Sequence, residues 1–384
     1  MKDPKSRGVL AALLASASLT VMSGATIAAS LPHIQEIFSD TQDAELLTRL
    51  VLTLPALFIA IGAPFAGMFI DRYGRIKPML FGLILYALGG TSGLYATTLE
   101  GILVGRALLG SAVAIIMTVT TTLAGDYFSG EARNRYVGLQ GMAMAFGGVV
   151  FILLGGFMAD IHWRVPFAIY FASLLIFPFA LYFLKEPQKI IHSDDHNDHI
   201  RQSLLPVYLI GFLGMVAMYM VPVQLPFLLH QKFDLGGTMI GVIIASATLT
   251  AAIASSQYRR LRHKLSIRGV YTLLLLFYGS GFVGIGFAPG YGILHFFAVV
   301  SGFGMGWFMV NSHTWMLERA HPAFRGRASG FMATAIFLGQ FASPIVMQPV
   351  IEQIGVQHSF ALVGAVMFLW LGYLVLSQRR QKHT

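Results

Sequence analysis

The chain has 384 residues, of which 56% are hydrophobic and only 11% are Asp, Glu, Lys or Arg, with a formal net charge of +9 at pH 7. A water-facing surface normally needs about 25% charged residues, so this composition excludes an ordinary soluble domain and predicts a membrane protein. Cysteine is absent, which excludes disulfides, thiolate metal sites and cysteine nucleophiles.

The sequence contains about twelve apolar runs long enough to cross a bilayer as helices. The first run follows a short basic stretch, but it is longer than the apolar part of a cleavable secretory signal, so we expect it to be retained. In chain order, the predicted spans are 9–31, 48–70, 78–97, 101–125, 137–158, 163–184, 204–229, 238–256, 270–289, 291–316, 328–350 and 357–377. The predicted fold class is an all-α membrane protein with twelve transmembrane helices.

Positive charge gathers in the connections on one side of these spans. Only Arg164 and Lys232 fall in connections on the other side, and Arg49 and Arg106 fall within spans. Cytoplasmic loops are enriched in Lys and Arg, so this asymmetry predicts that both termini are cytoplasmic in a multi-pass plasma or bacterial inner membrane protein. The excess of cations therefore requires no nucleic-acid partner.

The longest polar interruption, 185–203, divides the spans into two groups of six. We expect an N-terminal bundle, 1–184, this central cytoplasmic loop, and a C-terminal bundle, 204–384. Matches at an offset of half the chain, 192 residues, support an internal repeat: Arg133, Arg135, Gly138 and Gly147 correspond to Arg325, Arg327, Gly330 and Gly339. Parallel six-helix repeats are typical of transporters whose substrate binds near the membrane midplane.

The connection between the second and third spans, GMFIDRYGRIKP, combines an acid, glycines and cations. An acid just past a helix end can accept hydrogen bonds from the amides at another helix's N-terminus, so we expect Asp71 to contact the span that starts near Ala328. Arg75 can pair with Asp126 at the end of the fourth span. We expect the contacts of Asp71, Arg75 and Asp126 to form a gate latch that holds the two halves shut on the inside, with Gly67, Arg72, Gly74 and Arg133 as the further gating or motif residues. The alternative is a solvated turn that serves only orientation.

Arg106 is the charge that lies clearly inside a predicted span, where it costs about 3 kcal/mol. No acid falls in the middle third of any span. The hydroxyls of Ser16, Ser23 or Thr26, the carbonyls of broken helices, or an anionic substrate can satisfy the guanidinium. We hypothesise an anionic or zwitterionic substrate; the alternative is that Arg106 only holds the first and fourth spans together.

Further polar side chains within spans are candidates for the substrate cavity: Tyr219, Gln224, Asn311, His313 and Gln340. His313 can titrate near neutral pH, so it is a candidate proton carrier, although a packing role is the alternative.

The cluster HSDDHNDH, 192–199, contains three histidines among aspartates, which suit a divalent metal. A hydrated linker is the favoured interpretation, and no metal or other cofactor is predicted. The sequence contains no phosphate-binding P-loop and no HExxH or GxSxG motif, so neither ATP-driven transport nor an enzyme is supported.

These motifs resemble known patterns. Gly67, Asp71, Arg72, Gly74, Arg75 and Lys77 resemble the loop between helices two and three of major facilitator superfamily transporters. Leu103, Arg106 and Gly110 resemble the family's fourth-helix motif, and Leu31-Pro32 resembles the end of the first helix in the drug-efflux branch. Two features differ from that branch: Phe151-Ile152 stand where a Gly-Pro pair is common, and Met22, Ser23 and Gly24 stand where the first helix often has an acid.

The resemblance implies two pseudo-symmetric six-helix bundles and a secondary transporter, expected to be a monomer in the lipid bilayer. We expect alternating access and proton-coupled efflux of a drug-like or anionic or zwitterionic metabolite. The alternative is an uptake permease for a small organic anion or a siderophore-like metal chelate. A lipid-modifying membrane enzyme and a receptor or scaffold are rivals from other classes, but the sequence shows neither clustered catalytic residues nor a large soluble domain.

Overall fold

The computed structural model describes residues 7–187 and 203–380, which form helices and no strands. Eleven of these helices are long and apolar enough to cross a membrane. The last of them, α13 (Arg325–Arg380), is broken at Gly355, whose φ of 78° lies in the left-handed region that favours glycine. The break divides α13 into two segments, so the described residues supply the twelve predicted spans.

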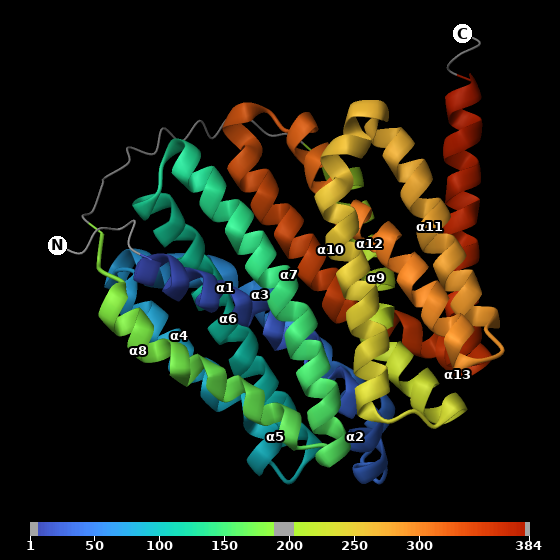
Figure 1. Cartoon of the computed structure of the whole chain (residues 1–384), viewed down its shortest axis with the longest axis horizontal. Coiled ribbons are helices and arrows are strands. Elements are labelled where there is room, and N and C mark those ends of the chain that lie inside the picture. Colours follow the sequence, from blue (N-terminus) through green and yellow to red (C-terminus); the bar gives the residue numbers. More distant parts are fainter. Residues whose placement is uncertain (1–6, 188–202, 381–384) are drawn as a thin grey trace. The chain divides into compact units, whose positions relative to one another are not determined.

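Contacts between residues divide the chain into two compact units, Met1–His196 and Asn197–Thr384. In the first unit, α6 packs against α3, α4 and α1, and α1 also packs against α7 and α8. The helices of this unit are α1 (Arg7–Ala25), η1 (Ala28–Ser30), α2 (Leu31–Ile37), α3 (Ala44–Tyr73), α4 (Ile76–Gly90), α5 (Ser92–Tyr95), α6 (Leu99–Tyr127), α7 (Gly130–Ile161), η2 (Val165–Phe171) and α8 (Ala172–Phe183) (Figure 1).

The second unit repeats this packing. Its α12 packs against α10 and α11, as α6 packs against α3 and α4, while α13 packs against α9 and α11. The helices are α9 (Leu205–Phe233), α10 (Gly237–Lys264), α11 (Ile267–Phe287), α12 (Tyr291–Arg319), η3 (Pro322–Phe324) and α13.

Matching close approaches show that the two units are pseudo-symmetric. A Cβ added to Gly89 on α4 would lie 2.6 Å from the backbone nitrogen of Leu109 on α6. Half a chain later, a Cβ added to Gly281 on α11 would lie 2.6 Å from the backbone nitrogen of Ser301 on α12. Small residues let helix backbones approach in lipid, so the same helix pair is packed in the same way in both units.

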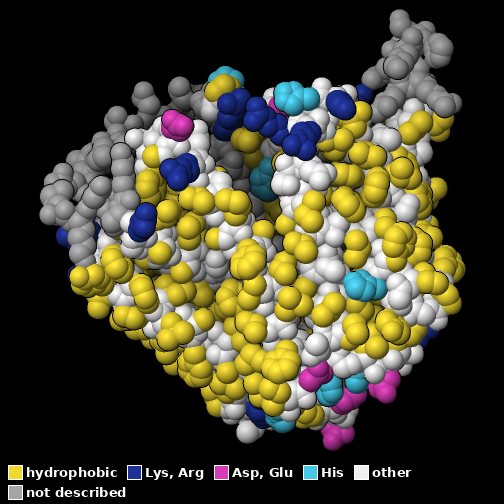
Figure 2. All heavy atoms as spheres, in the orientation of Figure 1, with side chains coloured by type: hydrophobic (Ala, Val, Ile, Leu, Met, Phe, Trp, Pro, Cys, Tyr) yellow, Lys and Arg dark blue, Asp and Glu magenta, His cyan; other side chains and the backbone are white. Residues whose placement is uncertain are grey.

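The surface of the helices suits lipid rather than water. Large apolar side chains are widely exposed, for example Phe146 at 75% and Leu369 at 76%. On the face visible in Figure 2, hydrophobic side chains cover the middle, and charged side chains gather at the upper and lower margins. This distribution is that of an integral multi-pass membrane protein.

The helices extend beyond several predicted spans. The eighth predicted span ends at 256, but α10 continues to Lys264 and includes Arg259, Arg260 and Arg262. Hydropathy falls where a helix leaves the bilayer, whereas Arg, Leu and Lys remain good helix formers in water. The basic segment after this span is therefore largely helical rather than a loop.

Candidate functional site

The turn between α3 and α4 is shaped by Gly74. Its φ of 82° is strained for any residue with a side chain, and it reverses the chain between Tyr73 and the first residues of α4. Asp71 and Arg72 are exposed on the last turn of α3. Contact between Asp71 and the helix that starts near Ala328 would join the two units and stays a prediction.

The predicted pair between Arg75 and Asp126 is present. The Nε of Arg75 donates to Oδ2 of Asp126 over 3.1 Å, and the two side chains are 18% and 28% exposed. A partly exposed pair of this kind contributes up to about 1 kcal/mol. It ties the start of α4 to the end of α6.

Glu186, just after α8, caps the start of α4. Its carboxylate accepts hydrogen bonds from the backbone N–H groups of Arg75 over 2.7 Å and of Ile76 over 3.0 Å. The first amides of a helix have no intrahelical partner, and the helix dipole favours a negative charge there. A Cβ on Gly74 would lie 2.6 Å from Oε1 of Glu186, so this carboxylate gives a second reason for glycine at that position.

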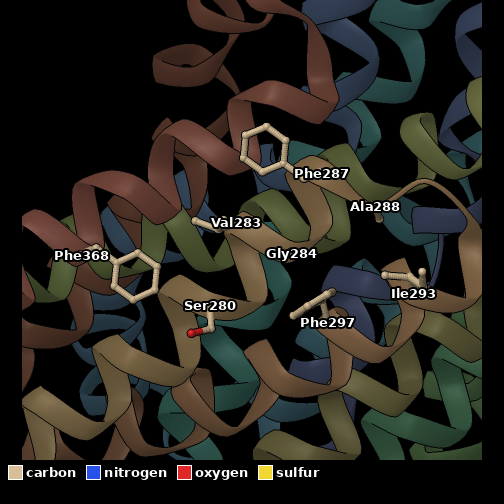
Figure 3. Close-up of a pocket in the computed structure, with 8 residues that line it drawn as sticks. All are labelled: Ser280, Val283, Gly284, Phe287, Ala288, Ile293, Phe297 and Phe368. Atoms are coloured by element: carbon tan, nitrogen blue, oxygen red, sulfur yellow. The ribbon is translucent and has the colours of Figure 1, made fainter.

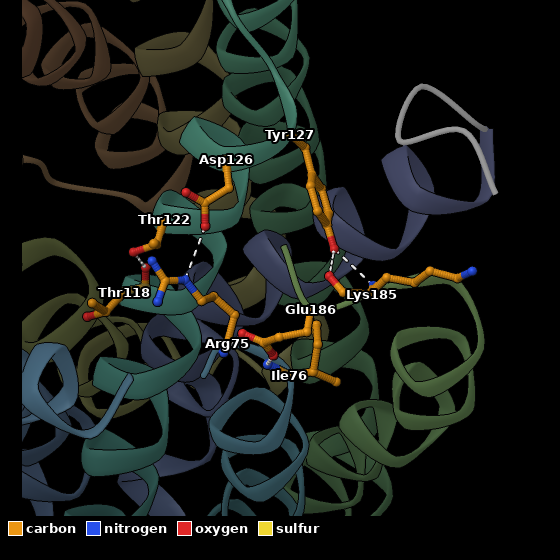
Figure 4. A network of polar contacts seen from close by, with 8 residues as sticks. All are labelled: Arg75, Ile76, Thr118, Thr122, Asp126, Tyr127, Lys185 and Glu186. Carbon is orange, nitrogen blue, oxygen red and sulfur yellow. Dashed lines mark hydrogen bonds and ion pairs between the residues drawn. The ribbon is translucent and has the colours of Figure 1, made fainter. Parts of the chain in front are cut away.

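Tyr127 completes a closed set of contacts around this turn (Figure 4). Its hydroxyl accepts a hydrogen bond from the backbone N–H of Lys185 over 2.9 Å and donates to the carbonyl of the same residue. On α6, Asp126 thus binds the turn between α3 and α4, and its neighbour Tyr127 binds the segment after α8. Glu186 joins that segment to the turn. We call Arg75, Asp126, Tyr127, Lys185 and Glu186 the α4 clamp.

The sequence pattern did not indicate Glu186 or Tyr127. The available signal was the position of Glu186 as the first acid after the sixth span, but its targets are backbone amides 111 and 110 residues away. Of the remaining motif residues, Arg133 is exposed near the start of α7, and no atom lies within 4 Å of a Cβ added to Gly67. Neither belongs to the clamp.

The second unit repeats the ion pair but not the remote cap. Glu318, half a chain after Asp126, accepts a hydrogen bond from Nη2 of Arg262 over 2.9 Å. The N-terminus of α11 is capped locally, because the hydroxyl of Ser266 accepts from the N–H of Gly269 over 3.1 Å. The two units therefore differ in how the equivalent N-termini are capped: a distant glutamate caps α4, and a neighbouring serine caps α11.

Arg106, on α6, is fully buried and bound by backbone carbonyls. Its Nε donates to the carbonyl of Val51 over 2.7 Å, and its Nη2 donates to that of Ser23 over 2.6 Å. Both carbonyls are released by helix breaks. Pro55, four residues after Val51, has no N–H to offer, and Ser23 lies in the last turn of α1.

The predicted hydroxyl partners of Arg106 are wrong. Ser16, Ser23 and Thr26 donate their hydroxyl protons to carbonyls of their own segment, as serine and threonine commonly do in membrane helices. The alternative of broken-helix carbonyls is the one observed.

The guanidinium of Arg106 also lies over the ring of Tyr170 in η2, with Cζ 5.1 Å from the ring centroid. No carboxylate pairs with it among the described residues. Arg106 therefore ties α1, α3 and η2 to α6, and its buried Nη1 has no hydrogen-bond partner.

Asn311 is buried and engaged on both sides of its amide. Its Oδ1 accepts from the hydroxyl of Tyr258 over 2.9 Å, and its Nδ2 donates to the carbonyl of Ile267 over 3.3 Å. It joins α10 and the start of α11 to α12, which favours a packing role. Tyr219 and Gln340 are half-buried on α9 and α13.

Two histidines of α12 each have one ring nitrogen bonded. Nδ1 of half-buried His313 lies 3.0 Å from the carbonyl of Met309 and therefore carries the proton. Nε2 of His295 lies 2.9 Å from Oγ of Ser246 on α10, whose own proton goes to the carbonyl of Ile243. His295 was not among the predicted site residues, although it is a second titratable group in the same span.

Gln224 is buried on α9, beside Pro222 and Pro226. The histidine cluster His192, His196 and His199 lies outside the described residues.

Comparisons with known proteins agree with this fold. The matching family model is that of the Major Facilitator Superfamily, over residues 13–237 and 207–384. The chain is 24% identical over 351 residues to Multidrug resistance protein 2 of Bacillus subtilis (strain 168), with 84% of each chain covered. It is 30% identical over 182 residues to Quinolone resistance protein NorB of Staphylococcus aureus (strain JH9), covering 45% of this chain and 37% of that relative.

Two solved structures share the fold. A bacterial homolog of the human lysosomal transporter Spinster, in an inward-facing and occupied conformation, superposes with a TM-score of 0.77 at 17% identity, covering 97% of this chain and 96% of that one. A D-xylose-proton symporter gives a TM-score of 0.74 at 15% identity, with coverage of 94% and 96%. With the family model matching most of the sequence, the chain belongs to the Major Facilitator Superfamily and is a membrane transporter, not an enzyme, related to the drug-efflux branch.

Proposed function

We propose that this transporter exports a small drug-like solute of anionic or zwitterionic character from the cytoplasm by alternating access, driven by the proton gradient. Both termini would be cytoplasmic, and the monomer would be the functional form. The relatives named for multidrug and quinolone resistance support export. The solute's charge is inferred from Arg106.

The observation that carries the proposal is the buried cation without an acid. Arg106 is 0% exposed, and its neighbours supply neutral carbonyls and a tyrosine ring. Such a group keeps its full positive charge, and a charge in a low-dielectric interior acts strongly on nearby charged solutes. The unpaired Nη1 can donate to a carboxylate, whereas a cationic drug would be repelled.

Proton coupling needs a titratable group within the spans. The predicted spans have no acid in their middle thirds, so His295 and His313 on α12 are the proposed carriers. Five helical turns separate them, which places both on one face of the helix. The bound nitrogen of each ring fixes one tautomer and leaves the other nitrogen to accept a proton.

The α4 clamp is proposed to be the gating element of the first unit. It makes the start of α4, the end of α6 and the segment after α8 move together, because each is hydrogen-bonded to the next. Segments that move as one set suit the rigid-body rocking by which transporters of two repeats alternate.

The test uses inside-out membrane vesicles with an imposed proton gradient, acidic inside. Norfloxacin as a zwitterion, benzoate as an anion and ethidium as a cation serve as probes. The proposal expects the zwitterion or the anion to accumulate in the vesicles, no accumulation of ethidium, and loss of transport in Arg106→Ala at normal protein levels. Depletion of the anion would favour an uptake permease, and ethidium accumulation that is unaffected by Arg106→Ala would refute the inferred charge of the solute.

A further inference from the structure

An open apolar hollow of about 340 Å³ lies on the second unit, lined by α11, α12 and the second segment of α13. Figure 3 shows side chains from these three helices around it, including the rings of Phe287, Phe297 and Phe368. Its one polar side chain is Ser280. Its volume falls within the range of pockets that hold small molecules.

The hollow runs along α11. Ser280 and Ala288 line its two ends on that helix, and at 1.5 Å per residue they are separated by roughly 12 Å. Because α11 spans the membrane, the hollow extends from inside the hydrocarbon to the helix end. Phe287 and Ile293, at the outer end, are 68% and 48% exposed, so the hollow opens directly to lipid.

A lysine marks the end of the hollow that lies at the membrane surface. Nζ of Lys232, at the end of α9, lies 3.4 Å from the carbonyl of Ala288 and 2.5 Å from Oε1 of Gln357. These bonds use two of its three protons and hold the ammonium beside the hollow. No carboxylate pairs with Lys232 among the residues that the structure describes.

Lys232 is not needed to cap the C-terminal end of α11. Nε2 of Gln357 already donates to the carbonyls of Ile285 and Ala288, over 3.3 and 3.0 Å. In the first unit, Arg164 alone binds the corresponding carbonyls of Gly93 and Ala96. The second unit therefore has both a capping residue and an additional exposed cation.

We propose that the hollow and Lys232 together bind one anionic phospholipid, with an acyl chain in the hollow and the phosphate on the ammonium. An acyl chain matches an apolar hollow that opens to the bilayer. A headgroup phosphate matches a single cation at the level where the helix leaves the hydrocarbon, because an exposed ammonium forms charge-assisted hydrogen bonds with phosphate oxygens. The site is independent of the transported solute.

The experiment uses the purified full-length chain in detergent and native mass spectrometry with phosphatidylglycerol and phosphatidylcholine. Lys232→Gln removes the charge, and Ser280→Phe fills the inner end of the hollow. The matched control is Arg259→Gln, which removes an exposed cation near the C-terminal end of α10, the end of that helix far from Lys232. Thermal unfolding without added lipid checks that each variant is folded.

Lys232→Gln is expected to weaken phosphatidylglycerol binding about five-fold, as the loss of one exposed ion pair implies, and to weaken phosphatidylcholine binding less, because choline offsets the charge of its phosphate. Ser280→Phe is expected to weaken both lipids, and Lys232→Arg to restore the preference. Equal behaviour of Lys232→Gln and Arg259→Gln would overturn the headgroup contact. If a folded Ser280→Phe variant binds both lipids normally, the acyl chain does not occupy the hollow.

Discussion

Removal of the Glu186 carboxylate isolates the contribution of the α4 clamp. Glu186→Ala leaves the amides of Arg75 and Ile76 without their acceptor, at bond lengths of 2.7 and 3.0 Å. Loss of a capping side chain costs about 0.5–2 kcal/mol, and the lost charge at a helix start adds about 0.3–1 kcal/mol before solvent screening. Because Glu186 is exposed, we expect a total of about 1–2 kcal/mol.

Two assays measure this change. Thermal unfolding in detergent should show a loss of about 1–3 °C for Glu186→Ala, a smaller loss for Glu186→Gln, which keeps one acceptor oxygen, and recovery with Glu186→Asp. The absence of cysteine allows a single cysteine introduced at the buried Met79, on the first turn of α4, to report opening of the turn through its labelling rate. The rate should rise in Glu186→Ala.

Asp40→Asn removes another exposed acid, in the turn after α2, and it is the matched control. The capping argument is refuted if Glu186→Ala and Asp40→Asn have the same melting temperature and the same labelling rate at residue 79.

Three further changes test neighbouring contacts. Gly74→Ala should destabilise the chain by about 1–2 kcal/mol because of the positive φ at this position, and the new Cβ should add a cost through its contact with the Glu186 carboxylate. The double variant with Glu186→Ala should therefore lose less stability than the two single variants lose together. Additive changes in melting temperature would contradict this. Pro55→Ala restores a backbone N–H that competes with Arg106 for the carbonyl of Val51. The substitution should therefore lower the urea midpoint of unfolding when Arg106 is present and raise it in the Arg106→Met background. A change of the same sign in both backgrounds would disprove the competition. Asn311→Leu should lower the free energy of unfolding by about 2 kcal/mol, because the Ile267 carbonyl and the Tyr258 hydroxyl each lose a hydrogen-bond partner. Transport per folded molecule should stay normal. A folded but inactive variant would assign Asn311 to the substrate path.

The helical spans could be predicted from the sequence because hydrophobic length alone decides which segments cross a bilayer. The pairing of Arg75 with Asp126 was also predictable, since both residues lie at the ends of adjacent spans and carry opposite charge. The kink at Gly355 coincides with the polar gap between the last two predicted spans.

Contacts to the backbone could not be predicted in the same way. The carbonyl of Val51 is available to Arg106 only because Pro55 follows it by one helical turn and α6 brings the guanidinium to that level. Glu186 binds amides rather than a charged side chain, so no complementary residue type marks its target. Tertiary packing, not residue type, decides both contacts.

The central claim is that a proton gradient drives the export of an anionic or zwitterionic solute. The most direct measurement follows the internal pH of proteoliposomes with pyranine while norfloxacin is added on the cytoplasmic side of the protein. The account predicts proton movement opposite to the solute, abolished by Arg106→Ala and reduced by His295→Gln together with His313→Gln. Solute transport with no accompanying pH change, or with proton movement unaltered in these folded variants, would contradict it.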